Sequence, residues 1–146
     1  MLLQYAKRFL FLSLLLLFSA CQNTTPTTTP KTPVNQRLHD IWIVKKINGE
    51  PVEKTRKTPI LEINLTTMKI HGNDGCNEFS GNIKSISDTK MQLQKIRETE
   101  IGCPNMQESA QFNTNIQQAF TYQLKGLNLI FFDENGKELL LFLKGD

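Results

Sequence analysis

Short runs of β-branched and aromatic residues, separated by turn residues, most limit how this 146-residue chain can fold. The first run, residues 41–47, is stopped by Asn48 and Gly49, which predicts a strand followed by a tight turn. Further runs follow at similar spacing, at residues 60–65, 68–71, 83–86 and 91–96. The pattern predicts a mainly β domain, and Trp42 is expected in its core because its neighbours are Ile and Val.

One segment, residues 105–122, breaks this β pattern. Asn105 supplies a helix N-cap and Glu108 an acidic first turn. The apolar residues then recur at the helical period, at Phe112, Ile116, Ala119 and Phe120. We therefore expect one amphipathic helix whose apolar side covers another element.

The C-terminal segment has two apolar runs, residues 127–132 and 137–143, on either side of an Asn-Gly pair at residues 135–136. Asn-Gly is a strong signal for a hairpin with a two-residue turn. Such a hairpin is apolar on both faces, so we expect a barrel interior and the helix to bury it. Its pairs are Phe132 with Leu139, Ile130 with Leu141, Phe131 with Leu140, and Leu129 with Phe142. It also opposes Asp133 to Glu138, a like-charge pair that a longer loop avoids.

Residues 1–20 have the three parts of a secretory signal peptide. Basic Lys7 and Arg8 precede an apolar run at residues 9–18, and small residues follow. As a helix, this run of ten residues would extend about 15 Å, half of a ~30 Å hydrocarbon core. We therefore expect an export signal and no permanent transmembrane helix.

Residues 18–21, Phe-Ser-Ala-Cys, resemble the lipobox that precedes the acylated cysteine of bacterial lipoproteins. This resemblance implies lipidation of Cys21 by a thioether-linked diacylglycerol and an acylated amine, which together anchor a protein stably to a membrane. The alternative is an ordinary signal peptide with an incidental cysteine. Gln22 in place of Asp implies, for a Gram-negative cell, an outer-membrane lipoprotein that faces the periplasm.

Residues 21–37 contain the acylated cysteine and a Thr/Pro-rich stretch with almost nothing apolar to bury, so we expect an extended tether. The whole chain has 39% hydrophobic and 21% charged residues, ordinary values for a globular protein, and we expect residues 38–146 to form one globular domain. The formal charge of the chain is +3. Two of the 17 basic residues, Lys7 and Arg8, lie in the leader. Without the leader, 15 basic residues remain against 14 acidic residues. This balance gives no basic surface for nucleic acid.

The densest local pattern is a seven-residue motif with two glycines and one aromatic: Gly75, Cys76, Asn77, Glu78, Phe79, Ser80 and Gly81. Because Gly and Asn tolerate positive φ, the motif predicts a compact turn. Together with Trp42, the Thr-x-x-x-Cys segment at residues 99–103, the helix and the final hairpin, it resembles the META domain of HslJ-like lipoproteins. The resemblance covers about residues 38–143. Ile101 and Gly102 stand where that family commonly has Met and Ala.

This resemblance implies a single α+β domain, mainly β, with a highly curved, barrel-like antiparallel sheet and one packed α-helix. It implies no catalytic residues and no cofactor. The family is associated with heat-shock and drug-tolerance phenotypes, which implies a link to envelope stress without defining a molecular activity.

Cys76 and Cys103 remain once Cys21 is assigned to the lipid. In an oxidising compartment such a pair most simply forms a disulfide, worth roughly 3 to 4 kcal/mol for a loop of about 28 residues. Two separate buried thiols are one alternative, and a redox or metal site is another. The spacing is not Cys-x-x-Cys, and a zinc site that used His71 would lack a second convincing ligand. We expect no metal.

No arrangement in the sequence predicts catalysis. His39 and His71 belong to no readable Ser/His/Asp or Cys/His set. Asp74 and Glu78 bracket Cys76, and we interpret them as exposed loop residues and not as an acid/base pair. A basic cluster predicts a solvated face, with contact to an anionic envelope surface as the alternative: Lys45, Lys46, Lys54, Arg56 and Lys57.

We therefore expect a monomeric, noncatalytic lipoprotein that acts by contact with another envelope component, a protein or a polymer. The alternative is a carrier of a small apolar ligand inside the curved sheet. A pocket of roughly a few hundred Å³ would favour the carrier, whereas a packed centre would favour contact through the outer surface. The expected pocket lining includes Leu129, Phe131, Leu140 and Phe142.

Overall fold

The computed structural model describes residues 35–52, 57–104 and 106–145. The chain divides into two units, residues 1–31 and 32–146, and all described residues belong to the second. The predicted signal peptide, Cys21 and most of the tether lie outside the described residues, as do Asn105, Lys54 and Arg56. None of the helices described here is both long enough and apolar enough to cross a membrane.

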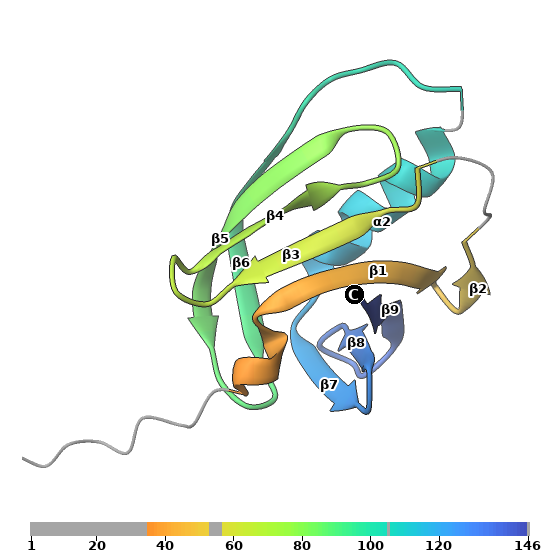
Figure 1. Cartoon of the computed structure of the whole chain (residues 1–146). Coiled ribbons are helices and arrows are strands. Elements are labelled where there is room, and N and C mark those ends of the chain that lie inside the picture. Colours follow the sequence, from red (N-terminus) through yellow and green to blue (C-terminus); the bar gives the residue numbers. More distant parts are fainter. Residues whose placement is uncertain (1–34, 53–56, 105, 146) are drawn as a thin grey trace, which may run out of the picture. The chain divides into compact units, whose positions relative to one another are not determined.

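Alternation of buried and exposed side chains accounts for most of the strands, whose arrangement Figure 1 shows. In β3 and β4, for example, every second residue is buried, as expected when one face of a strand lies on a core. The described part of the chain contains the 3-10 helix η1 (Gln36–Leu38), the helix α2 (Met106–Gln118) and nine strands. The strands are β1 (Asp40–Ile47), β2 (Glu50–Pro51), β3 (Ile60–Asn64), β4 (Lys69–Asn73), β5 (Glu78–Ile86), β6 (Met91–Glu98), β7 (Thr121–Lys125), β8 (Asn128–Phe132) and β9 (Glu138–Lys144).

The strands form one antiparallel sheet in the order β6-β5-β4-β3-β1-β9-β8-β7, and β2 pairs with β1 beside this path. At one end the two outermost strands meet, because Lys90, just before β6, pairs with Thr121 in β7. The backbone N–H of Met91 donates to the Phe120 carbonyl at 3.2 Å, and that of Tyr122 donates to the Thr89 carbonyl at 2.8 Å. The sheet is therefore a curled half-barrel whose outer strands are joined at one end.

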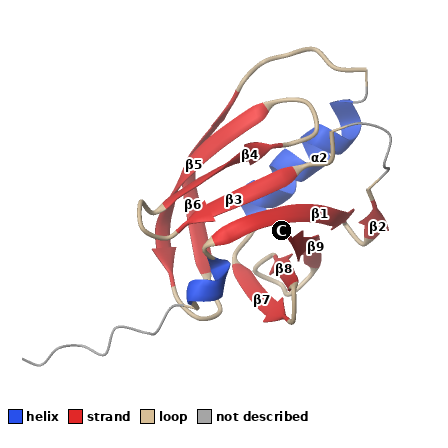
Figure 2. Ribbon diagram, in the orientation of Figure 1, coloured by secondary structure: helices blue, strands red, loops and turns tan. Residues whose placement is uncertain are grey.

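Helix α2 packs against this sheet (Figure 2), and its Phe112 and Ile116 share one core with the inward-facing strand side chains. Trp42 lies in that core at 1% exposure, as predicted, and its indole N–H donates to the Leu38 carbonyl at 3.0 Å. Leu38 itself is fully buried, so the folded part already includes η1. The predicted class, mainly β with one packed helix, is confirmed.

The helix is shorter than predicted. It ends at Gln118, and Phe120, which we expected on its apolar side, is only half-buried and precedes β7. The reason is strand pairing: the Phe120 N–H donates to the Phe132 carbonyl at 2.9 Å, at the point where the β7–β8 ladder begins. Residues 121–125 therefore form a strand that the helical spacing concealed.

Three of the four predicted pairs in the final hairpin are confirmed: Phe131 with Leu140, Ile130 with Leu141, and Leu129 with Phe142. The pair of Phe132 with Leu139 was wrong. The register shifts between Phe131 and Phe132, so Phe132 lies opposite Glu138 and Leu139 turns into the core at 2% exposure.

The shift follows from a loop longer than two residues, the alternative that the like-charge pair had suggested. The Asp133 N–H donates to the Lys137 carbonyl at 3.0 Å. The Asp133 carboxylate in turn accepts the N–H groups of Asn135 and Lys137, each at 2.9 Å. The loop thus spans residues 133–137, and the Asp side chain holds it closed.

The hairpin is buried mainly through its inner face. On the outer face, Ile130 is buried but Leu141 is only half-buried, so the expected burial of both faces holds in part. Four side chains of the inner face are completely inaccessible: Leu129, Phe131, Leu140 and Phe142.

Candidate functional site

The predicted compact turn occupies only the first half of the seven-residue motif. Gly75 has φ +96° in the β4–β5 loop, and its N–H donates to the Asn73 side-chain oxygen at 2.8 Å. From Glu78 onward the motif is strand β5, in which Phe79 and Gly81 are buried while Glu78 and Ser80 are exposed. The turn prediction was therefore wrong for residues 78–81, because their alternation lets them pair with β4.

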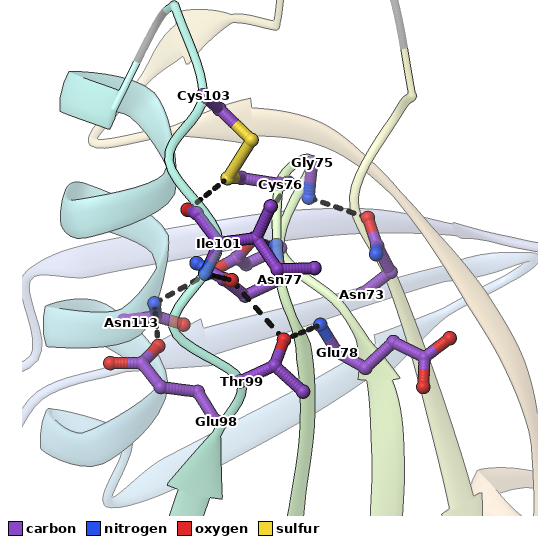
Figure 3. The surroundings of a disulfide bond; sticks show 11 residues. Asn73, Gly75, Cys76, Asn77, Glu78, Glu98, Thr99, Ile101, Cys103 and Asn113 are labelled. Carbon is purple, nitrogen blue, oxygen red and sulfur yellow. Dashed lines mark hydrogen bonds between the residues drawn. A yellow bond between two sulfur atoms is a disulfide. The ribbon is translucent and has the colours of Figure 1, made fainter.

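Cys76 and Cys103 are joined by a disulfide, with an S–S distance of 2.02 Å and a Cα–Cα distance of 5.9 Å (Figure 3). Of the three alternatives for these cysteines, the structure contains the bridge. It ties the β4–β5 loop to the segment between β6 and α2 across 27 residues of sequence. The Cys76 sulfur also lies 3.3 Å from the Ile101 carbonyl oxygen.

Asn77 holds the same segment without covalent chemistry (Figure 3). Its side-chain oxygen accepts the Ile101 N–H at 2.7 Å and the Thr99 hydroxyl at 3.1 Å. The Thr99 hydroxyl oxygen accepts the Glu78 N–H at 3.2 Å, and the Thr99 N–H donates to the Glu78 carbonyl at 2.9 Å. The Asn77 amide, 7% exposed, is therefore a structural joint between the motif and the end of β6.

Asp74 is the buried charged group of this site, at 1% exposure. Its carboxylate accepts the N–H groups of Cys76 at 2.7 Å and Asn77 at 2.5 Å, and the Asn113 amide at 2.7 Å. Burial by itself would raise the pKa of Asp74, but these hydrogen bonds and one from Ser109 outweigh it and lower the pKa below 3.8. The interpretation of Asp74 as an exposed loop residue was wrong.

Helix α2 docks onto the loop through both polar and apolar contacts. The Asn113 amide nitrogen donates to Asp74 and also to the Glu98 carboxylate. Two carboxylate acceptors fix the orientation of this amide, and its own oxygen is buried without a hydrogen bond among the described residues. At the preceding helix position, the ring of Phe112 packs against that of Phe79, with their centroids 5.4 Å apart.

Sequence reasoning missed the helix residues Ser109 and Asn113, and also Asn115. Asn115 is 4% exposed and donates 3.0 Å hydrogen bonds to the Asn48 side chain and to the Leu139 carbonyl. A signal was present, since polar residues 109 and 113 are four apart on the side that carries Phe112.

The remaining candidates do not converge on a reactive centre. His39, His71 and Glu78 are exposed, and Glu78 lies on a strand while Asp74 lies in the loop. Within residues 35–52, 57–104 and 106–145, no three His, Cys, Asp or Glu side chains are grouped so that they could hold a metal ion. Lys45 and Lys46 are exposed side by side because the β1 register shifts between Val44 and Lys46.

The comparisons with known proteins bear on this arrangement of loop, disulfide and helix. The family model described as the META domain matches residues 36–146. The chain belongs to the META domain family. This META domain begins at η1, two residues before the boundary expected from the sequence. The comparison with curated proteins gives no significant match.

Two solved structures are similar to this META domain. One NMR structure is 23% identical and covers 73% of this chain and 90% of its own, with a TM-score of 0.60. An NMR structure of a protein from Burkholderia xenovorans is 17% identical and covers 77% of this chain and 90% of its own, with a TM-score of 0.56. At this identity the two structures show a shared fold.

Proposed function

We propose that the chain is a noncatalytic lipoprotein of the cell envelope, anchored through acylated Cys21, whose META domain acts by contact with another envelope component. The sequence supports the anchor through the signal-like residues 1–20 and the lipobox-like residues 18–21. In a Gram-negative cell the protein would lie at the outer membrane, facing the periplasm, and contribute to envelope stress tolerance through a protein or polymer partner.

The packed interior is the observation that carries the contact mechanism. Trp42, Phe131 and Phe142 are 0–1% exposed, so these large side chains fill the concave side of the sheet. The four side chains expected to line a carrier pocket are all fully buried. A filled centre argues against the carrier and favours recognition through the outer surface.

A surface cleft of about 590 Å³ lies elsewhere, between the end of α2, the β5–β6 arm and the β8–β9 loop. Its lining is largely polar and contains none of the four carrier residues; it includes Lys84, Gln92, Gln118, Phe120, Asp133 and Glu134. Such a lining suits a polar partner better than an apolar ligand.

Chemical features of the buried site also support a noncatalytic role. The carboxylate of Asp74 is engaged by four hydrogen-bond donors, and these donors belong to the protein's own loop and helix. Its lowered pKa follows from structural hydrogen bonds and leaves it a poor general base near neutral pH. The motif thus stabilises the fold.

Metabolic labelling with a fatty-acid analogue tests the anchor. The wild-type protein should take up label, and Cys21→Ala should abolish it. A Cys76→Ser/Cys103→Ser double variant is the matched control, because it removes the two disulfide-bonded cysteines and should remain labelled. Label retained on Cys21→Ala would refute the anchor.

Cross-linking in the native envelope tests the contact mechanism. We expect the anchored protein to yield the same cross-linked partner, a protein or a polymer fragment, in independent preparations, and Cys21→Ala to lose it. Repeated failure to capture any partner from correctly anchored protein would remove the main support for this function.

A further inference from the structure

A surface cleft lies where α2 ends and β7 begins. It is the cleft of about 590 Å³ between the end of α2, the β5–β6 arm and the β8–β9 loop, and we call it the Phe120 cleft. Its volume is within the range of sites for small molecules, roughly 300 to 1,000 Å³. A ligand of that size would contact β6, α2 and the β8–β9 loop together, since each of them contributes to the lining.

Phe120 ties two sides of the cleft together through its backbone. Its N–H donates to the Phe132 carbonyl at 2.9 Å, and its carbonyl accepts the Met91 N–H at 3.2 Å. The Phe120 ring is half-buried and lines the cleft, and the Lys90 ammonium lies 5.1 Å from its centroid in a cation–π contact. The cleft therefore contains an aromatic ring whose position does not depend on a ligand.

Two polar groups of the lining are each held through one atom and open at another. The Ser85 hydroxyl donates to the Gln92 side-chain oxygen at 3.1 Å, and the amide nitrogen of Gln92 has no acceptor within the described part of the chain. One carboxylate oxygen of Asp133 accepts the N–H groups of Asn135 and Lys137, each at 2.9 Å. Its other oxygen has no donor among the described residues. A donor from β6 and an acceptor from the β8–β9 loop thus line one cleft in fixed orientations.

The other polar groups of the lining match a ligand rich in hydroxyl groups. The amides of Gln117, Gln118 and Asn135 also line the cleft, and an amide both donates and accepts hydrogen bonds. A hydroxyl group does the same, so a sugar can pair with the open donor of Gln92 and with the open acceptor of Asp133. The negative face of an aromatic ring attracts the C–H groups of a sugar ring. Amides, a carboxylate and one aromatic ring together are therefore suited to an oligosaccharide.

Charge and backbone pairing argue against two other polar ligands. Among the described residues of the lining, Lys84 stands against two carboxylates, Asp133 and Glu134, so the cleft lacks the positive charge that an anionic polymer requires. A peptide that adds as a strand needs free backbone groups at a sheet edge. Beside Phe120, the Tyr122 N–H already donates to the Thr89 carbonyl at 2.8 Å.

We propose that the Phe120 cleft binds a neutral oligosaccharide, a segment of an envelope glycan. The Phe120 ring lies against the C–H groups of one sugar, the Gln92 amide donates to a sugar oxygen, and a sugar hydroxyl donates to Asp133. This inference rests on the proposed contact with an envelope component and names the chemistry of a polymer partner.

Titration with a free oligosaccharide tests the site. The full acylated chain, isotope-labelled and held in detergent micelles, is titrated with chitotetraose, the neutral tetrasaccharide of N-acetylglucosamine. The NMR chemical shifts of N–H groups at residues 91–93, 118–122 and 133–136 should move together. Those of β4, which contributes nothing to the lining, should stay unchanged.

Two substitutions and a matched control identify the contacts. Gln92→Ala should weaken binding about tenfold, the effect of one lost hydrogen bond. Gln94→Ala should bind like the wild type, because Gln94 is an exposed glutamine of the same strand outside the lining. Phe120→Leu keeps an apolar side chain but removes the ring, and it should also weaken binding about tenfold. The same spectra report whether each variant is folded.

Unchanged shifts at the cleft, shifts that gather on another surface, or equal affinities of Gln92→Ala and Gln94→Ala would each overturn this inference. The titration depends on neither the anchor nor the native partner, because a free oligosaccharide is added and mass measurement reports acylation separately. A protein partner cross-linked in the envelope, together with unchanged shifts on adding chitotetraose, would refute the glycan ligand and leave the proposed contact function standing.

Discussion

The side-chain oxygen of Asn77 accepts the backbone N–H of Ile101 at 2.7 Å, which fastens the β4–β5 loop to the segment leading from β6 into α2. The disulfide of Cys76 with Cys103 fastens the same two pieces one residue earlier in the loop and two residues later in the segment. A covalent bond and a buried amide thus perform one task, and each can be removed separately.

Asn77→Ala should lower the free energy of unfolding by about 2 kcal/mol, because two hydrogen bonds to a 7% exposed amide disappear and their donors lose their partner. Urea unfolding measures this. Ser80→Ala, an exposed substitution in the same motif, should change stability by less than about 0.5 kcal/mol. Equal effects of the two substitutions would contradict the role given to Asn77.

Cys76→Ser/Cys103→Ser should lower the free energy of unfolding by about 3 to 4 kcal/mol. The bridge joins residues 27 positions apart in the sequence and so restricts the unfolded chain. Urea unfolding with and without a reductant provides the measurement. The reductant should lower the midpoint of the wild-type protein and leave that of the double variant unchanged. A wild-type midpoint insensitive to complete reduction would show that the bridge contributes nothing.

Gly72→Ala should destabilise the fold by more than about 3 kcal/mol or prevent folding, because a Cβ there would lie 2.2 Å from the Ile60 carbonyl oxygen and 2.7 Å from the Phe79 ring. Gly102→Ala is the matched control. A Cβ at Gly102 meets nothing within 4 Å, so the change should be neutral or stabilise by about 0.4 to 1 kcal/mol. Thermal unfolding compares them, and a tolerated Gly72→Ala would contradict the packing described.

Asp74 should make the free energy of unfolding depend on pH in the acid range. Because its pKa is lowered below 3.8 in the folded chain, its ionised form stabilises the fold above about pH 4, and this contribution is lost as the pH falls through the lowered pKa. Asp74→Asn should therefore be less stable than wild type at pH 7, and the difference should shrink below pH 4.

Urea midpoints measured between about pH 2 and pH 7 test this dependence. Asp40→Asn is the control: a hydrogen bond from Lys144 lowers the pKa of Asp40 as well, but that pair lies at the surface and contributes little. An acid dependence that is unchanged by Asp74→Asn, or that vanishes with Asp40→Asn, would assign the titration to another group.

Local patterns predicted most of the strands, because alternation and turn residues act within a few positions. The Asn48-Gly49 turn formed with φ values of 53° and 86°, and the inner register of the final hairpin was largely correct. The sequence could not reveal β7, since its Tyr122 belongs equally well to a helical series until β8 is present to pair with it.

The buried side-chain hydrogen bonds were harder to predict because they join residues far apart in the chain. Asp74 meets Asn113 across 39 positions, and Asn48 meets Asn115 across 67. An isolated Asp between Asn73 and Gly75 reads as a turn residue. Only the folded chain shows that helix α2 covers it and turns a surface-type residue into a buried anion.

The β-bridge between Lys90 and Thr121 joins the outermost strands of the sheet at one end. The unpaired N–H and C=O groups of an edge strand can pair with a strand of another molecule, which starts aggregation and fibre formation. A sheet whose edge strands are partly joined to each other offers less unpaired backbone to neighbouring copies, which limits edge-to-edge aggregation.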